Sequence, residues 1–205
     1  IKASSISNLT DARYFAAYGV DWIGFNFNPE SPGYISPEQA AEIKGWLHGP
    51  KIVGEFSNQD WENVVNITSF LKLDAVEVGP QFEASKLADL DVPVFVKLEL
   101  DTENASTVLQ QVQRYKGGAE MFRILLNCSN DWETFQKDTP ELLVLLQTLI
   151  KENQVLLDFV FSAKHFQSVV TALDPVGLSV AGGEEEKVGV KLYDELDEIM
   201  DAIYD

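Results

Sequence analysis

Charged and polar side chains stand at the ends of successive apolar runs in this sequence. Those with the most chemical capacity are Glu55, Glu77, Lys97, Glu99, Asn127 and Asp158. Acids grouped around a lysine can shift one another's pKa values and transfer protons, or they can bind a divalent cation through their oxygens. Ser4 closes the first run and adds a hydroxyl. Whether these side chains meet depends on the elements that carry them.

Eight strand-like runs alternate with eight segments that are typical of helices. The predicted strands are 2–6, 22–27, 52–56, 73–78, 94–98, 122–126, 155–160 and 176–180, and the predicted helices are 12–18, 39–47, 61–71, 81–87, 103–115, 140–151, 162–173 and 193–204. Strict alternation predicts βαβ units and a parallel sheet, and eight repeats favour a closed (βα)8 TIM barrel in a single domain, 1–205. A doubly wound open sheet is the alternative, but no glycine-rich turn follows the opening strand. In a barrel, the residues that end the strands share one mouth.

The loop after the last predicted strand is a candidate anion site. It reads Ala181-Gly182-Gly183-Glu184, and backbone amides at this place in a barrel often hold a phosphate. A glycine-permitted tight turn is the alternative. The carboxylates that start at Glu184 oppose a phosphate, and Lys187 and Lys191 offset them only in part.

The sulfur and imidazole groups are too few and too scattered to predict a metal site. Cys128 is the only cysteine, which excludes a disulfide framework, and no cation stands beside it in the sequence to stabilise a thiolate. His48 and His165 lie far apart and form neither an HxH nor an HExxH motif. We expect a structural cysteine, no metal and no cofactor.

Charge and length narrow the classes of partner. The chain has 205 residues and a formal net charge of −18. Nucleic acids and anionic membranes select basic surfaces, so neither is expected as a partner. No apolar run approaches the ~18 to 20 residues of a membrane span. We expect a cytoplasmic protein, a monomer or a homodimer, with a small-molecule ligand that is phosphorylated in one alternative.

Several stretches resemble phosphoribosylanthranilate isomerase, the tryptophan-pathway (βα)8 enzyme, over essentially the whole chain. The most specific is residues 21–43, which is similar to the family segment "lGFiFypkSPRYvspeqa". Residues 6–13 resemble its "ITNLEDA" opening, residues 53–58 and 73–78 resemble its third and fourth strands, and residues 177–185 with 189–191 resemble its "GVDVSSGVE…GVKD" close. The resemblance implies the barrel fold and an Amadori rearrangement of an aminoaldose to an aminoketose.

The resemblance also implies particular catalytic groups, and this chain departs from them. The family's general base is a cysteine that ends strand one, and the chain has Ser4 there. The general acid is an aspartate that ends strand six, and the chain has Asn127, whose amide cannot transfer a proton at neutral pH. After strand two, the family has an arginine that binds the substrate carboxylate, and this chain has Gly33 there. After strand seven, the family has a double-glycine turn that binds phosphate, and this chain has the segment that begins at Asp158.

These departures lead to a functional hypothesis with two alternatives. We expect an isomerase-like barrel that lacks efficient isomerase activity, with Ser4, Asn127 and Asp158 as positional candidates for catalysis. The predicted substrate-binding residues are Gly33, Glu77, Lys97, Gly182 and Gly183. An active isomerase in which Asp158 or Glu77 takes over as acid or base is one alternative. The other is a barrel enzyme of changed specificity or a non-catalytic binding protein.

Overall fold

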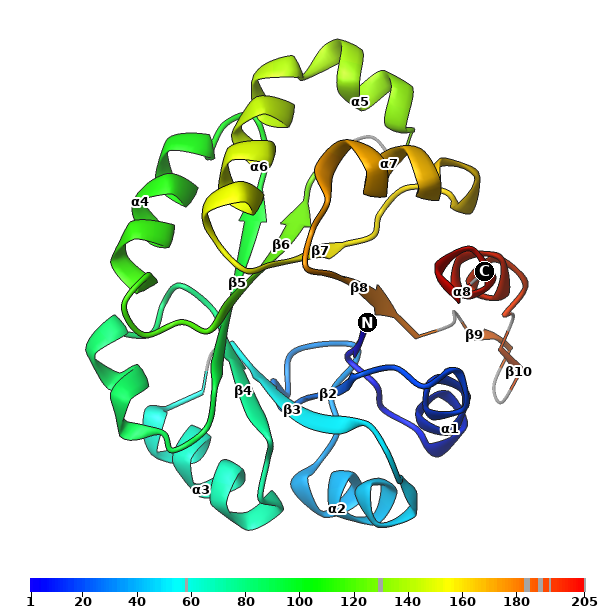
Figure 1. Cartoon of the computed structure of the whole chain (residues 1–205). Coiled ribbons are helices and arrows are strands. Elements are labelled where there is room, and N and C mark those ends of the chain that lie inside the picture. The colour runs from blue at the N-terminus through cyan, green and yellow to red at the C-terminus, as the bar shows by residue number, and fades with distance from the viewer. Residues whose placement is uncertain (58, 129–130, 183–184, 188–189, 192, 205) are drawn as a thin grey trace.

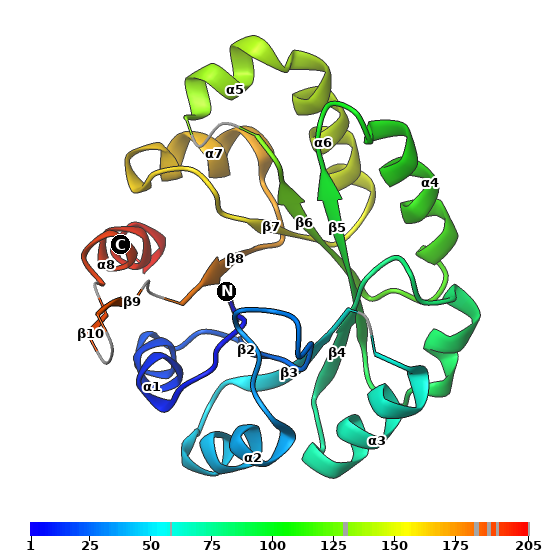
Figure 2. The same ribbon diagram turned by 180° about the vertical axis from the view of Figure 1, so that it is seen from behind.

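The computed structural model closes all eight predicted strands into one parallel barrel (Figures 1 and 2). It describes residues 1–57, 59–128, 131–182, 185–187, 190–191 and 193–204. The barrel strands, each paired with the next and β8 with β1, are β1 (Lys2–Ser4), β2 (Trp22–Asn26), β3 (Lys51–Phe56), β4 (Ala75–Val78), β5 (Val94–Leu100), β6 (Met121–Leu126), β7 (Val155–Asp158) and β8 (Gly177–Ala181). The predicted fold class is therefore confirmed.

Helices surround the barrel on its outside, as Figure 1 shows. They are α1 (Leu9–Tyr18), α2 (Pro37–Trp46), α3 (Trp61–Leu71), η1 (Ala84–Asp89), α4 (Ala105–Tyr115), α5 (Trp132–Asp138), α6 (Pro140–Glu152), η2 (Ala163–His165), α7 (Phe166–Leu173) and α8 (Asp194–Tyr204). A two-stranded antiparallel hairpin, β9 (Glu185–Lys187) with β10 (Val190–Lys191), lies between β8 and α8. None of the helices that the structure describes has the length and apolar content needed to span a bilayer.

Helix starts follow the expected local chemistry. Ser36 and Gln39 form a capping box ahead of α2, with Pro37 in its first turn. Asn8 accepts a hydrogen bond from the Asp11 amide at the start of α1, and Gly19 ends that helix in the left-handed conformation at φ 76°. These caps fix both ends of α1 and the start of α2.

Two helical segments differ from the sequence prediction. Where a helix is predicted at 81–87, the structure has a 3-10 segment, η1, that begins later, at Ala84, and the Tyr115 hydroxyl donates to the Pro80 and Phe82 carbonyl oxygens just ahead of it. The unpredicted α5 precedes α6. Asp131 caps it, and its Trp132 packs against Phe161.

The barrel interior is built in layers. Its deepest layer, toward the amino ends of the strands, is apolar and contains Val53, Ala75, Phe95 and Leu156, with Trp22 and Met121 packed against them. The next inward position on a strand lies two residues further along the chain. Five such positions are Gly24, Glu55, Glu77, Lys97 and Arg123. The apolar floor therefore supports a layer that is largely ionic.

Candidate functional site

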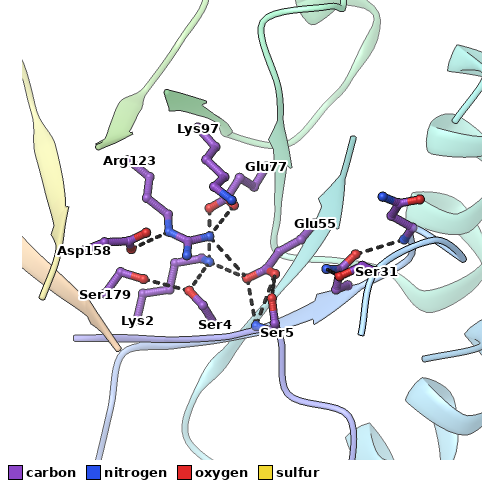
Figure 3. Close-up of polar contacts among 12 residues, drawn as sticks. Lys2, Ser4, Ser5, Ser31, Glu55, Glu77, Lys97, Arg123, Asp158 and Ser179 are labelled. Carbon is purple, nitrogen blue, oxygen red and sulfur yellow. Dashed lines mark hydrogen bonds and ion pairs between the residues drawn. The ribbon is translucent and has the colours of Figure 1, made fainter. Parts of the chain in front are cut away.

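Five charged side chains from five strands meet inside the barrel, below its mouth (Figure 3). They are Lys2, Glu55, Glu77, Arg123 and Asp158, and all are buried. We call this set the ionic layer. Two cations face three carboxylates, so the layer carries a formal charge of −1. Buried charges persist in proteins when they are paired and hydrogen-bonded.

Lys2 forms the first centre of the ionic layer. Its Nζ lies 2.5 Å from Oε1 of Glu55 and 3.0 Å from Oε2 of Glu77. The same ammonium donates a hydrogen bond of 2.8 Å to the Ser4 hydroxyl. The Glu77 contact joins opposite charges without hydrogen-bond geometry, and no hydrogen-bond partner of Oε2 is found in the part of the chain that the structure describes.

Arg123 forms the second centre. Its Nη1 donates to Glu77 at 2.7 Å, and its Nε donates to Asp158 at 2.6 Å. Burial of Arg123 opposes its charge, but Glu77, Asp158 and Glu55 outweigh that effect and raise the pKa of the guanidinium above its ordinary value. The guanidinium is therefore a permanent cation that bridges β4, β6 and β7.

Glu55 connects the cations of the ionic layer to Ser5, the residue that follows β1. Burial alone would raise the pKa of its carboxyl, but the charges of Lys2 and Arg123 lower it to about 2. Ser5 donates to this carboxylate from its backbone amide, at 3.1 Å to Oε2, and from its hydroxyl, at 2.8 Å. These bonds hold Ser5 at φ 54°, a left-handed conformation that non-glycine residues rarely adopt.

Gly24 makes room for the ion pair between Lys2 and Glu55. A Cβ atom at this position would lie 2.0 Å from Oε1 of Glu55 and 3.1 Å from the Lys2 ammonium. A side chain on Gly24 would therefore displace the carboxylate from the lysine.

Ser4 lies within this network, and its hydrogen-bond partners among the described residues are an ammonium and a hydroxyl. It is buried, accepts from Lys2, and shares a hydrogen bond of 2.7 Å with the Ser179 hydroxyl. An ammonium and a second hydroxyl are both unsuited to remove its proton. The structure therefore brings Ser4 and Asp158 into hydrogen-bond contact with the two cations of the ionic layer, Ser4 with Lys2 and Asp158 with Arg123.

Asn127 stands apart from the other two catalytic candidates. It follows the last residue of β6 and is exposed, and its backbone amide donates to the Leu100 carbonyl at 2.9 Å. No hydrogen bond from the described residues ties its side chain to Ser4 or Asp158. The sequence candidates therefore divide into two buried groups and one exposed amide.

The predicted substrate-binding residues are dispersed around the mouth. Glu77 belongs to the ionic layer, whereas Lys97 is half-buried at the rim, 3.8 Å from Glu99. Gly33 packs over β1: a Cβ there would lie 3.1 Å from that of Ser5. Gly182 faces α1, where a Cβ would lie 2.8 Å from Asp11 Oδ2. Gly183, like Glu184, lies outside the described residues.

Comparisons with known proteins decide the family. The family described as N-(5'phosphoribosyl)anthranilate (PRA) isomerase matches residues 1–122, more than half of the chain. This chain belongs to the phosphoribosylanthranilate isomerase family. The isomerase of Thermotoga maritima is 28% identical over 96% of this chain and 94% of its own. That of Rubrobacter xylanophilus is 26% identical over 93% and 92%.

Solved structures of this family share the fold. The T. maritima phosphoribosylanthranilate isomerase superposes with a TM-score of 0.77 at 24% identity, covering 99% of this chain and 97% of that one. Another phosphoribosylanthranilate isomerase, solved in complex with reduced 1-(o-carboxyphenylamino)-1-deoxyribulose 5-phosphate, superposes with a TM-score of 0.74 at 24% identity over the same shares. The barrel is thus that of the phosphoribosylanthranilate isomerase family.

Lys2 and Arg123 are the site residues that sequence reasoning missed. Both lie on strands, and Arg123 stands between the buried Phe122 and Ile124. Strand alternation carries the signal, since a charged residue flanked by two apolar residues that face the helices must point into the barrel. The predicted grouping of acids around Lys97 is therefore corrected. Glu55, Glu77 and Asp158 contact Lys2 and Arg123, and Glu99 is the acid that lies near Lys97.

The sulfur and imidazole groups occupy structural positions. Cys128 is half-buried, and burial raises the pKa of its thiol to about 11, which disfavours a thiolate nucleophile. His165 is buried at η2, with Nε2 3.3 Å from Oδ2 of Asp131. Neither side chain joins the ionic layer.

Proposed function

We propose that this protein is a phosphoribosylanthranilate isomerase-like barrel that lacks efficient isomerase activity and binds a small molecule at its mouth. The observation that carries the proposal is the engagement of Ser4 and Asp158 in the ionic layer, while Asn127 alone stands at the position of the family's general acid. The Amadori rearrangement that the family resemblance implies needs both an acid and a base. A general acid or base contributes typically ~10²- to 10⁴-fold to a rate.

Asp158 and Glu77 are poor substitutes for the missing groups. Each carboxylate accepts a hydrogen bond from Arg123, and both are buried. Separating a buried ion pair costs about 3–5 kcal/mol, which corresponds to roughly 10²- to 10⁴-fold in rate. A proton transfer that must first break these contacts would lose what the new acid or base supplies. The hydrogen bonds from Arg123 therefore disfavour a catalytic role for Asp158 or Glu77.

Anion binding is also weak at the mouth. Gly33 stands where the resemblance implies a carboxylate-gripping arginine, and it packs against Ser5. The ionic layer below the mouth has an excess of one carboxylate, which opposes an anionic substrate. Phosphate and carboxylate groups together are therefore poorly matched to this barrel. The proposed ligand is a small molecule with less negative charge than phosphoribosylanthranilate.

Steady-state kinetics with phosphoribosylanthranilate test the proposal. We expect kcat/KM to be at least about 10³-fold below that of the T. maritima isomerase measured side by side, since two groups worth ~10²- to 10⁴-fold each are replaced. We also expect no growth rescue of a tryptophan auxotroph that lacks the isomerase. A kcat/KM within about tenfold of the T. maritima enzyme would overturn the proposal.

A gain-of-function variant tests whether the substituted positions cause the loss. Ser4→Cys with Asn127→Asp restores both implied group types, and we expect it to raise turnover above that of the wild type. Gln113→Glu, which adds a carboxylate on the exposed face of α4, is the matched control and should leave turnover unchanged. Equal turnover in the double variant and the control would place the cause of any loss elsewhere in the mouth.

A further inference from the structure

A pocket of about 330 Å³ opens at the carboxyl ends of β4 and β5. Gly79, Pro80 and Gln81 form one wall, and the first turns of α4 form the other. Lys97 and Glu99 of β5 lie between the two walls. The volume is at the lower end of the range for small-molecule sites, so the pocket suits a ligand of few atoms.

Two opposite charges in this pocket are only loosely paired with each other. Nζ of Lys97 lies 3.8 Å from Oε1 of Glu99, beyond hydrogen-bond distance. Their side chains are 35% and 57% exposed, and no hydrogen bond from the described residues engages either charged group. An exposed pair of this kind contributes little stability, so a ligand displaces it at small cost.

Neutral hydrogen-bonding groups complete the walls. The side chains of Gln81, Thr107 and Gln111 line the pocket and have no hydrogen bond within the described part of the chain. Asn104 is already engaged, because its amide nitrogen donates to the Glu99 carbonyl and to Asp101. Its side chain therefore does not cap α4, and the first turn of that helix adds positive potential to its side of the pocket.

The charges around the pocket select against a plain anion. The ionic layer has an excess of one carboxylate, and Glu99 balances Lys97, so these seven side chains together keep a formal charge of −1. A ligand that carried only negative charge would meet Glu99 as well as Lys97. A ligand with one positive and one negative group close together would match both.

We propose that this pocket binds a small zwitterion of the α-amino acid class. Lys97 pairs with its carboxylate, Glu99 pairs with its ammonium group, and Gln81, Thr107 and Gln111 offer hydrogen bonds to a polar side chain. This inference does not rest on the loss of isomerase activity, because it concerns a different set of side chains and a binding event alone.

Calorimetric titration with the neutral L-α-amino acids tests the proposal, with L-glutamine as the member best matched to the free amides. Two analogues of L-glutamine serve as controls. Glutaramate is L-glutamine without the ammonium group, and 4-aminobutanamide is L-glutamine without the carboxylate. We expect at least one amino acid to bind with a Kd of 1 mM or tighter, and at least tenfold more tightly than its two analogues. Failure of every amino acid, or equal binding of an analogue, would overturn the proposal, as would tighter binding of inorganic phosphate.

Substitutions locate the binding event. Lys97→Met and Glu99→Gln should each weaken binding at least tenfold. Lys116→Met and Glu120→Gln are matched controls, because these exposed residues follow α4 at the opposite end of the barrel, and they should leave the Kd unchanged. Thermal unfolding confirms that all four variants are folded. If the Lys97 and Glu99 variants bind like the controls, the proposed site is wrong.

Discussion

At the scale of single residues, Lys2 has the most consequential contacts in the barrel. Its ammonium faces two carboxylates from β3 and β4 and a hydroxyl from its own strand, and the side chain is fully buried. Removing one partner of a buried ion pair leaves the others uncompensated. Glu55 and Glu77 would then be buried with Arg123 as their common cation, which reaches Glu55 only at 3.9 Å.

Lys2→Met should therefore destabilise the protein strongly. We expect a loss of about 3–5 kcal/mol in the free energy of unfolding, the range for breaking a buried ion pair. Urea unfolding followed by circular dichroism measures it. Lys116→Met, which removes an exposed lysine, should change stability by less than about 0.5 kcal/mol. If the two variants were equally stable, Lys2 would not be an essential cation of the layer.

At the scale of elements, tyrosines join the first and last helices of the barrel. The Tyr14 ring on α1 stacks on Tyr193 at 4.6 Å between centroids, and its hydroxyl donates to Asp197 on α8. The Tyr193 hydroxyl donates to Asp11 on α1 at 2.6 Å. Burial and the neighbouring Asp197 raise the pKa of Tyr14 above its ordinary value, so the phenol remains a donor. These contacts fasten α8 and the residue before it to α1.

Tyr14→Phe should loosen α8 without unfolding the barrel. A hydrogen bond to a charged acceptor contributes about 1.5–3 kcal/mol, and we expect a loss near the lower end of that range. Hydrogen exchange measured by mass spectrometry should accelerate most in α8. Tyr34→Phe, at an exposed tyrosine of the loop between β2 and α2, is the control. Unchanged exchange in α8 would show that the stacked rings hold the helix without the hydroxyl.

The elements were largely predictable from the sequence, whereas the ionic contacts between them were not. Alternation of apolar runs with capped segments such as 36–47 predicted both the strands and the barrel. Glu55, which pairs with Lys2, lies 53 residues away in the sequence, and Glu77, which pairs with Arg123, lies 46 residues away. Which charges meet depends on the stagger of the strands, and that stagger is set by the tilt of the strands in the closed barrel. Alternation places each charged side chain inside, but the pairing among them emerges only when the barrel closes.

At the scale of the whole molecule, the ionic layer makes the free energy of unfolding depend on pH in the acidic range. Glu55 has a folded-state pKa of about 2, against an ordinary value of 4.5. A carboxyl whose pKa is depressed by folding stabilises the protein fully above its ordinary pKa, and the contribution is lost as the pH falls toward the folded-state value.

The free energy of unfolding should therefore fall between about pH 4.5 and pH 2. Urea unfolding at several pH values in this window measures the slope. Glu55→Gln should flatten the slope, because an amide does not titrate there, whereas Glu120→Gln at an exposed position should leave it unchanged. A Glu55→Gln curve parallel to that of the wild type would refute the assignment.

The ionic layer also limits how this barrel can be recombined with its relatives. Its charges are distributed so that residues 1–92 hold Lys2, Glu55 and Glu77, and the rest of the chain holds Arg123 and Asp158. Consider a chimera of residues 1–92 of this chain with the second half of a relative. If that second half has no arginine inside the barrel, Glu77 would be buried with one cation fewer. Half-barrel exchange is therefore conditional here on transferring Arg123 with Glu77.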